Sequence, residues 1–180
     1  MNSASPTLLV TGVAGHLGRA LLGHLLDTLK IPPGRIIATT RKPETLVELA
    51  ARGVDVRAAD FDDPASLVPA FTGADRLLLV STDALMQPGQ RLAQHRNAID
   101  AAVQAGVKHV VYTSMPAPET SLVRFAPDHL GTEQALASSP LSWTVLRNAW
   151  YFENLLHSVP GALAGGQWFS AAGEGGIAYI

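Results

Sequence analysis

The chain has 180 residues, of which 47% are hydrophobic and 16% are charged. This balance is typical of one compact domain with its own core and excludes a largely disordered chain. The net charge of -2 provides no basic field that would attract nucleic acid. Because the sequence contains no cysteine, disulfides, thiolate catalysis and cysteine metal sites are excluded.

No apolar stretch approaches the roughly 20 residues that a membrane span needs. Residues 1–6 also lack the basic and apolar regions of a secretory signal. We therefore expect a cytoplasmic protein that does not use a membrane as a partner.

The chain opens with a predicted strand at residues 7–11 and a helical pattern at residues 17–29. This helix carries leucines four residues apart, which predicts one buried face. These leucines are Leu17, Leu21, Leu25 and Leu29.

Five further strands alternate with helices along the chain. The strands are predicted at residues 35–40, 54–59, 76–80, 109–112 and 143–146, and the helices between them at residues 43–52, 64–71, 90–105 and 128–138. Such alternation predicts an α/β fold of the Rossmann type, a doubly wound parallel sheet of six strands with helices on both faces. After the last of these strands we expect a helix at residues 151–157, an irregular stretch at 161–166, and short strands at 167–170 and 177–180.

Three glycines at a spacing of three, Gly12, Gly15 and Gly18, lie between the first strand and the first helix. Glycine permits positive φ and lets a pyrophosphate approach the backbone, and a helix N-terminus offers unpaired N–H groups to an anion. We therefore predict a dinucleotide-binding turn, with a tight turn that binds nothing as the alternative. The residues assigned to it are Thr11, Gly12, Val13, Ala14, Gly15, His16, Leu17 and Gly18.

The residues after the second strand predict which dinucleotide is bound. An acidic residue at this position would hold the ribose 2′-hydroxyl of NAD, but this chain has Arg41 and Lys42. A guanidinium and an ammonium favour the 2′-phosphate of NADP(H), so we predict a preference for NADPH. The alternative is a solvated basic loop.

Polar residues at the other strand ends complete the predicted cofactor site. Asp60 is placed to accept a hydrogen bond from the adenine amino group, with Phe61 packing nearby; the alternative is an ordinary Asp-rich turn. Ser81 and Thr82 after the fourth strand, and Thr113 at the end of the fifth, are predicted to border the nicotinamide. Small residues at these positions can equally serve only to make turns.

Several segments together resemble the NmrA-like branch of the atypical short-chain dehydrogenases/reductases, and within it the bacterial NAD(P)H:quinone oxidoreductases. The segments are Gly12-x-x-Gly15-x-x-Gly18, Thr40-Arg41-Lys42-Pro43, Gly89-Gln90-Arg91, Gln94-His95-Arg96-Asn97, Tyr112-Thr113-Ser114 and Leu146-Arg147-Asn148-x-Trp150-Tyr151-x-Glu153-Asn154. The resemblance covers essentially the whole chain. It implies a reductase without flavin or metal that uses NADP(H) to reduce a small-molecule quinone by direct hydride transfer.

The resemblance also bears on the reacting residues. Many short-chain dehydrogenases use Tyr-x-x-x-Lys on a helix and a serine after the fifth strand, here Ser114. This chain has His129 and Glu133 at the same spacing, which places both on one helix face. We interpret His129 as a proton donor that Glu133 orients. The alternative is a surface pair without a catalytic role.

The segment after the sixth strand is predicted to cover the nicotinamide. Asn148 belongs to this loop, and a planar quinone fits against Trp150 or Tyr151. The alternative is that the two aromatic side chains seal the core.

We divide the chain into an NAD(P)-binding domain at residues 1–156 and the start of a substrate-binding lobe at residues 157–180. Relatives of this branch continue further, so the lobe is expected to be truncated and its apolar edge to favour a homo-oligomer. A second candidate function is a regulator that senses NADP(H), binds a partner protein and has no turnover. A third is a reductase or isomerase of another small carbonyl or nucleotide-sugar-like substrate.

Overall fold

A computed structural model describes residues 5–168 and 175–180 of the chain. Its centre is one parallel sheet of six strands in the order β3-β2-β1-β4-β5-β6. The strands are β1 (Leu8–Val10), β2 (Ile36–Thr40), β3 (Asp55–Ala58), β4 (Arg76–Leu79), β5 (His109–Ser114) and β6 (Ser142–Arg147). The predicted Rossmann-type fold is therefore confirmed, and the strand order reverses beside β1, where such sheets bind their ligands.

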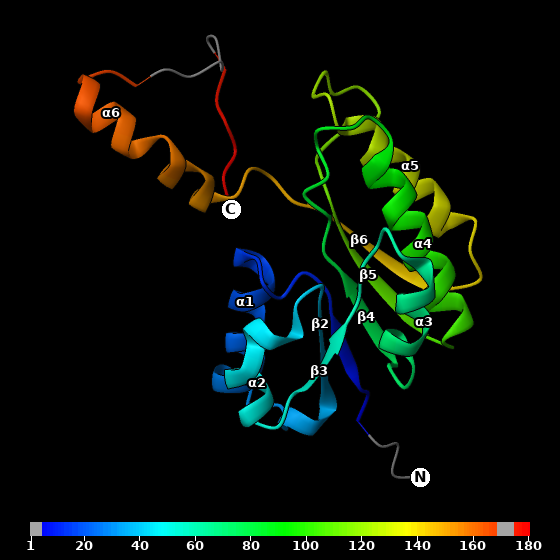
Figure 1. Cartoon of the computed structure of the whole chain (residues 1–180). Coiled ribbons are helices and arrows are strands. Elements are labelled where there is room, and N and C mark those ends of the chain that lie inside the picture. Colours follow the sequence, from blue (N-terminus) through cyan, green and yellow to red (C-terminus); the bar gives the residue numbers. More distant parts are fainter. Residues whose placement is uncertain (1–4, 169–174) are drawn as a thin grey trace.

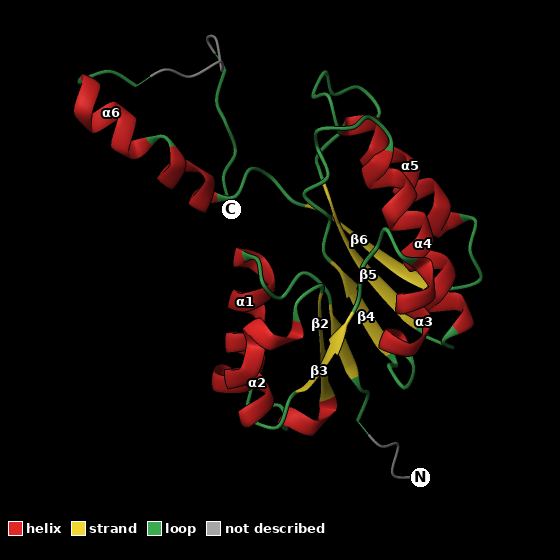
Figure 2. Ribbon diagram, viewed as in Figure 1, coloured by secondary structure: helices red, strands yellow, loops and turns green. Residues whose placement is uncertain are grey.

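Helices cover both faces of the sheet, as Figures 1 and 2 show. One face carries α1 (His16–Gly23), which continues into the π-helical turn η1 (His24–Thr28), and α2 (Val47–Ala51). The other face carries α3 (Pro64–Phe71), α4 (Gln90–Gln104) and α5 (Ala126–Ala137). Short 3-10 turns, η2 (Pro33–Arg35) and η3 (Pro43–Leu46), precede β2 and α2.

The buried face of α1 differs in one respect from the leucine pattern. Leu22, Leu25 and Leu26 pack with Val10 and Val13 in the core, whereas Leu29 is 54% exposed. Leu29 follows the π-helical turn and caps its end, and the wider turn rotates this position off the face that α1 buries. The prediction of one buried face is thus right for the middle of the segment and wrong for Leu29.

The core on the opposite face is apolar toward the amino ends of the strands and polar toward their carboxyl ends. Leu67, Phe71 and Leu77 are fully buried there. The first half of α4 instead turns Arg91 and His95 inward, and both are buried. The site described below is built on this polar half of the interface.

The segment after β6 leaves the sheet and forms an arm of two short helices, η4 (Phe152–His157) and α6 (Val159–Gly165) (Figure 1). The expectation of an irregular stretch at residues 161–166 is wrong, because α6 covers most of it. Pro160 suits a first helical turn, and Ala162, Leu163 and Ala164 favour helix. The predicted strand at 167–170 lies partly outside the described residues.

The last described residues return to the base of the arm. Tyr179 forms a parallel bridge with Trp150, and Phe152 N–H donates to the carbonyl of Ile180 at 2.9 Å. The N–H of Trp150 also donates to the carbonyl of Ala178, and the N–H of Ile180 donates to the carbonyl of Trp150, both at 3.1 Å. These contacts are all that the described part shows of the strand expected at residues 177–180.

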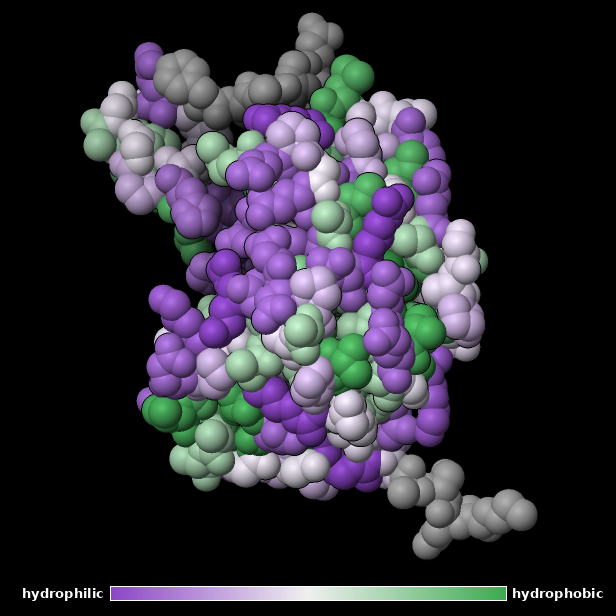
Figure 3. All heavy atoms as spheres, turned by 45° about the vertical axis from the view of Figure 1, so that its right-hand side comes forward, coloured by the Kyte–Doolittle hydropathy of each residue, from purple (hydrophilic) through white to green (hydrophobic). Residues whose placement is uncertain are grey.

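Exposed apolar side chains gather on the edge strand and the arm. They are Trp143, Leu146, Trp150, Phe152, Leu156 and Leu163. On the side of the molecule that Figure 3 brings forward, hydrophilic and hydrophobic residues are intermixed. Association through the edge stays a prediction.

Among the described helices, none is both long and apolar enough to cross a membrane.

The contact between β1 and α1 yields a stability test at Gly18. A Cβ on Gly18 would lie 2.5 Å from the carbonyl oxygen of Gly12, so Gly18→Ala must push α1 away from β1. We expect an overpacking cost of roughly 1–3 kcal/mol in the free energy of unfolding, measured by chemical denaturation. Gly23→Ala is the matched control, because Gly23 is helical and has open space around it. Equal effects of the two substitutions would contradict the close-contact argument.

Candidate functional site

The glycine turn presents an open backbone at the carboxyl end of β1. Gly12 has φ +65°, and Gly12, Ala14, Gly15 and His16 are exposed. The N–H of Gly15 donates to the carbonyl of Gly12 at 3.0 Å, which closes the turn. Since α1 begins directly behind it, the N–H groups of its first turn and the positive end of the helix dipole point toward the turn, an arrangement that suits an anion.

Three of the residues assigned to this turn support it from within. Val13 is completely buried in the core between α1 and the sheet, and Leu17 is half-buried. Thr11 Oγ1 donates to the carbonyl of Leu78 at 3.1 Å and accepts from the N–H of Val80 at 2.9 Å. Thr11 therefore links the end of β1 to β4, and both hydrogen bonds of its hydroxyl are made to protein backbone.

Arg41 and Lys42 lie exposed at the carboxyl end of β2, one strand away from the glycine turn. The turn is ordered by Thr40 Oγ1, which accepts from the N–H of Lys42, and by Thr45 Oγ1, which donates to the carbonyl of Lys42 at 2.7 Å. Within the described parts of the chain, neither cation forms an ion pair. Both are thus available to an anion near the turn.

The loop after β3 is held in a defined shape around Asp60. The N–H of Asp62 donates to Asp60 Oδ1 at 3.0 Å, and the N–H of Asp60 donates to Ser66 Oγ at 2.9 Å. Phe61 is buried and meets Phe71 edge to face with ring centroids 6.5 Å apart. The Phe61 ring belongs to the core, so any part it has in a nucleotide site is through its backbone.

The backbone that follows β4 is bonded to side chains of β5 and α4. The N–H of Ser81 donates to Thr113 Oγ1 at 2.9 Å, and the N–H of Thr82 donates to Nε2 of His95 at 3.1 Å. Thr113 is buried, while Ser81 and Thr82 are half-buried. Ser81 and Thr82 follow β4, the neighbour of β1, and Thr113 lies near the end of β5, one strand further, so all three are at the carboxyl edge of the sheet, as predicted from the strand ends.

A buried polar layer connects α4, β5 and α5 beneath this edge. Arg91 Nη1 lies 3.0 Å from Nε2 of His129, and Tyr112 Oη lies 2.7 Å from Nδ1. A guanidinium can only donate, so Nε2 accepts and the ring proton is on Nδ1, donated to Tyr112. The Arg91 guanidinium also lies over the Phe125 ring, 5.0 Å from its centroid.

His95, which lies on α4, is likewise hydrogen-bonded at both ring nitrogens. Its Nε2 accepts from the N–H of Thr82, so its ring proton is on Nδ1 and is donated to Thr132 Oγ1 at 2.9 Å. Burial, with a smaller effect of Arg91, lowers the pKa of His95 to about 3. The same two causes lower the pKa of His129 to about 4, against the opposing effect of Glu133. Both imidazoles are therefore neutral near pH 7.

Ser114 and Glu133 form a second cluster at the carboxyl end of β5. Ser114 Oγ donates to Glu133 Oε1 at 2.6 Å, and Arg147 binds Glu133 through Nε at 3.1 Å and Nη2 at 2.6 Å. Arg147 also pairs with Glu119 in the loop after β5. Glu133 is thus bonded to Ser114 and Arg147, whereas His129 is bonded to Arg91 and Tyr112.

The segment after β6 brings two of its predicted residues into contact. Asn148 Nδ2 donates to the hydroxyl of Tyr151 at 2.9 Å, and both residues are half-buried. Trp150 is 51% exposed and does not seal the core. Its ring offers an apolar surface on the arm side of the sheet edge.

Arg91, Gln94 and Arg147 are among the side chains of this region that were not predicted as site residues from the sequence. A signal for two of them was present. Arg91, Gln94, His95 and Ala98 follow the spacing of an inward helix face, and three of these four residues are polar. Arg147 gave no such signal, because its role depends on Glu133 and Glu119 from other parts of the chain.

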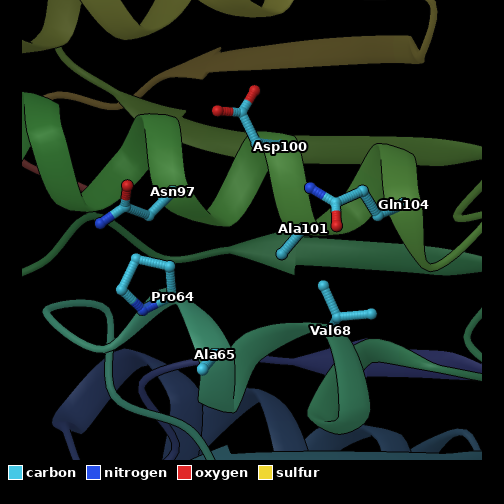
Figure 4. Close-up of a pocket in the computed structure, with 7 residues that line it drawn as sticks. All are labelled: Pro64, Ala65, Val68, Asn97, Asp100, Ala101 and Gln104. Atoms are coloured by element: carbon cyan, nitrogen blue, oxygen red, sulfur yellow. The ribbon is translucent and has the colours of Figure 1, made fainter.

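A hollow of about 340 Å³ lies away from the glycine turn, between α3 and α4 (Figure 4). Its lining is Pro64, Ala65, Val68, Asn97, Asp100, Ala101 and Gln104. Over residues 5–168 and 175–180, no group of three His, Asp or Glu side chains is arranged to hold a metal ion.

Curated relatives of the chain are oxidoreductases. Over 169 residues it is 44% identical to quinone oxidoreductase 2 of Escherichia coli (strain K12), a match that covers 94% of this chain and 57% of the relative. The chain therefore spans little more than half the length of that protein.

Two solved structures that resemble this one are also reductases. The structure matches an NADPH-dependent quinone oxidoreductase of Escherichia coli complexed with NADPH with a TM-score of 0.84 and 43% identity, over 92% of this chain and 56% of that one. It matches the Citrobacter sp. triphenylmethane reductase complexed with NADP(H) with a TM-score of 0.84 and 35% identity, over 93% and 58%.

The profile of the NmrA-like family matches residues 4–162, from the strand before the glycine turn to the arm. The sheet order, the glycine turn and this match over most of the chain agree, and the protein belongs to the NmrA-like family.

Proposed function

We propose that the protein is an NADPH-dependent quinone reductase that transfers hydride directly, without flavin or metal. The observation that carries this proposal is the glycine turn, where Gly18 leaves no room for a side chain and the exposed backbone lies one strand from Arg41 and Lys42. Relatives that share this fold are named as NADPH-dependent or bind NADP(H), which supports the same cofactor here.

The residues present fit an extended NADP(H) molecule along the carboxyl edge of the sheet. The pyrophosphate would lie against the turn at Gly12–Gly18, the 2′-phosphate beside Arg41 and Lys42, and the adenine amino group beside Asp60. The nicotinamide end would lie near Ser81, Thr82, Thr113 and Asn148. When bound, the reduced nicotinamide supplies a hydride.

On the quinone side, we propose that Ser114, Glu133 and His129 act on the substrate oxygens. The Ser114 hydroxyl is oriented by Glu133, whose carboxylate is paired with Arg147. His129 is oriented by Arg91 and Tyr112. The proton-donor role of His129 stays a prediction. Reduction of the quinone takes one hydride and one proton, and in this role His129 would take the proton from water and pass it on, because neither Arg91 nor Tyr112 gives up a proton at neutral pH.

The aromatic residues after β6 provide a surface for a flat substrate. Trp150 is half-exposed, and the hydroxyl of Tyr151 is anchored by Asn148. A quinone ring stacks on such a surface at the nicotinamide end of the site. In this proposal residues 157–180, which include α6, begin the lobe that closes over the substrate, and residues 1–156 bind the cofactor.

One observation keeps a regulator that senses NADP(H) as the second candidate. Both ring nitrogens of His129 are bonded to buried side chains, and no lysine stands at the position of Glu133. A protein with this arrangement can bind the dinucleotide and lack turnover. The quinone assay below separates the two functions.

Arg41→Ala tests the cofactor preference. Loss of one charge-assisted bond to the 2′-phosphate is worth about 1.5–3 kcal/mol, so the Kd for NADPH should rise roughly 10- to 100-fold. The Kd for NADH should not change. Isothermal titration with both nucleotides measures this, and Arg96→Ala, on the exposed side of α4, is the control. Tighter binding of NADH than NADPH by the wild type would overturn the assignment.

A benzoquinone assay tests the reaction itself. We expect the absorbance of NADPH to fall when a simple benzoquinone is added to the purified chain, with no flavin in the protein or the buffer. Binding of NADPH without oxidation would support the regulator. A requirement for added flavin would contradict direct hydride transfer.

The neutral histidines predict a loss of stability in acid. In the unfolded chain histidine has a pKa near 6.5, whereas the folded values are about 4 for His129 and about 3 for His95. The unfolded state therefore binds more protons as pH falls below 6.5, and each histidine should lower the free energy of unfolding by about 1.4 kcal/mol per pH unit down to its folded pKa.

Denaturation at several pH values between 7 and 4 measures this slope. His129→Gln should reduce it, because the glutamine amide does not titrate. His24→Gln, at an exposed position, is the control and should leave the slope unchanged. An unchanged slope in His129→Gln would show that His129 does not contribute.

A further inference from the structure

A polar stripe on α4 forms hydrogen bonds with the loop that follows β3. The stripe consists of Gln90, Gln94 and Asn97, which lie on one side of the helix at spacings of four and three residues. We propose that Gln94 and Asn97 are positioning residues for the adenine end of the cofactor, acting through the loop at residues 60–63. This inference rests on the proposed NADPH binding.

Asn97 controls one peptide plane of the loop. Its Nδ2 donates to the carbonyl of Phe61 at 2.9 Å. The N–H on the other side of the same peptide belongs to Asp62 and donates to Asp60 Oδ1 at 3.0 Å. Because a peptide unit is planar and rigid, fixing the oxygen also fixes the direction of the N–H. Asn97 thereby orients the Asp60 carboxylate. Among residues 5–168 and 175–180, nothing donates to its Oδ2, which leaves this oxygen for an external donor such as the adenine amino group.

Gln94 holds the next residue of the loop. Its Nε2 donates to Asp62 Oδ2 at 2.8 Å, while Gln90 Nε2 lies farther away at 3.4 and 3.5 Å from the two carboxylate oxygens. Gln94 is buried although Asp62 is exposed, so the helix side of this bond is fixed by packing. The loop is thus held at two successive residues from α4.

These links are made from outside the nucleotide-binding loop itself. Figure 4 places Asn97 on α4 across from Pro64, the first residue of α3, beside the hollow between the two helices. The ring of Phe61 in the core and Ser66 on α3 hold the same loop from other sides. The bonds from α4 add what these do not supply, which is the orientation of the peptide between Phe61 and Asp62.

Binding of cofactor fragments tests the proposal. Asn97→Ala and Gln94→Ala should each raise the Kd for NADPH and for adenosine 2′,5′-bisphosphate by roughly 3- to 10-fold, the value of one hydrogen bond. The Kd for reduced nicotinamide mononucleotide, which lacks adenine, should not change. Gln104→Ala is the matched control, because Gln104 lies on the same helix and lines the same hollow.

The bond between Gln94 and Asp62 allows a second test that does not depend on one variant. Asp62→Ala should weaken adenine binding as Gln94→Ala does, and the double variant should be no weaker than either single variant. Asp62→Asn keeps an oxygen acceptor and should restore most of the affinity. Thermal melting of each variant establishes that it is folded.

Each result has a distinct meaning. Unchanged affinity for the adenine ligands in both alanine variants overturns the inference. An equal loss for the nicotinamide mononucleotide also overturns it, because a general disturbance of the fold would then explain the effect. If the wild type binds none of the three ligands, the proposed function is overturned and this inference falls with it.

Discussion

The close approach of α1 to the end of β1 is the constraint on which the rest of the site depends. A Cβ at Gly18 would lie 2.5 Å from the carbonyl oxygen of Gly12, so only glycine allows the helix to start this near the strand. The approach leaves the backbone of the turn exposed beside the point where the strand order reverses. The ends of β2, β3, β4 and β5 then lie within reach of one extended ligand, because parallel strands end at the same edge.

Helix α4 supports the carboxyl edge of the sheet, because its polar side chains form hydrogen bonds in two directions. Gln94 and Asn97 reach the loop after β3, Arg91 and His95 reach α5, and His95 also contacts Tyr112 on β5. The helix can come this near to α5 because Gly131 faces Leu92, where a Cβ would lie 2.7 Å from the leucine side chain. The two ends of the proposed cofactor site are thus held by one rigid element.

The location of much of the candidate site was predictable from local sequence. The glycine turn, Arg41 with Lys42, and Asp60 each follow a strand directly, and the alternation of strands and helices indicates that all strand ends meet at one edge. The partners of His129 and Glu133 were not predictable in this way. Spacing places both on one helix face, but the structure bonds His129 to Arg91 and Tyr112, and Glu133 to Ser114 and Arg147.

The sequence by itself determined the α/β class, the position of the glycine turn and its basic neighbour, because these depend on residues adjacent in the chain. Only the tertiary structure decided how polar side chains pair across elements. Arg91 and His129 are 38 residues apart, Asn97 and Phe61 are 36 apart, and Ser114 and Glu133 are 19 apart. Such pairs form only when the sheet order and the helix packing have set which faces meet, and no local pattern carries that information.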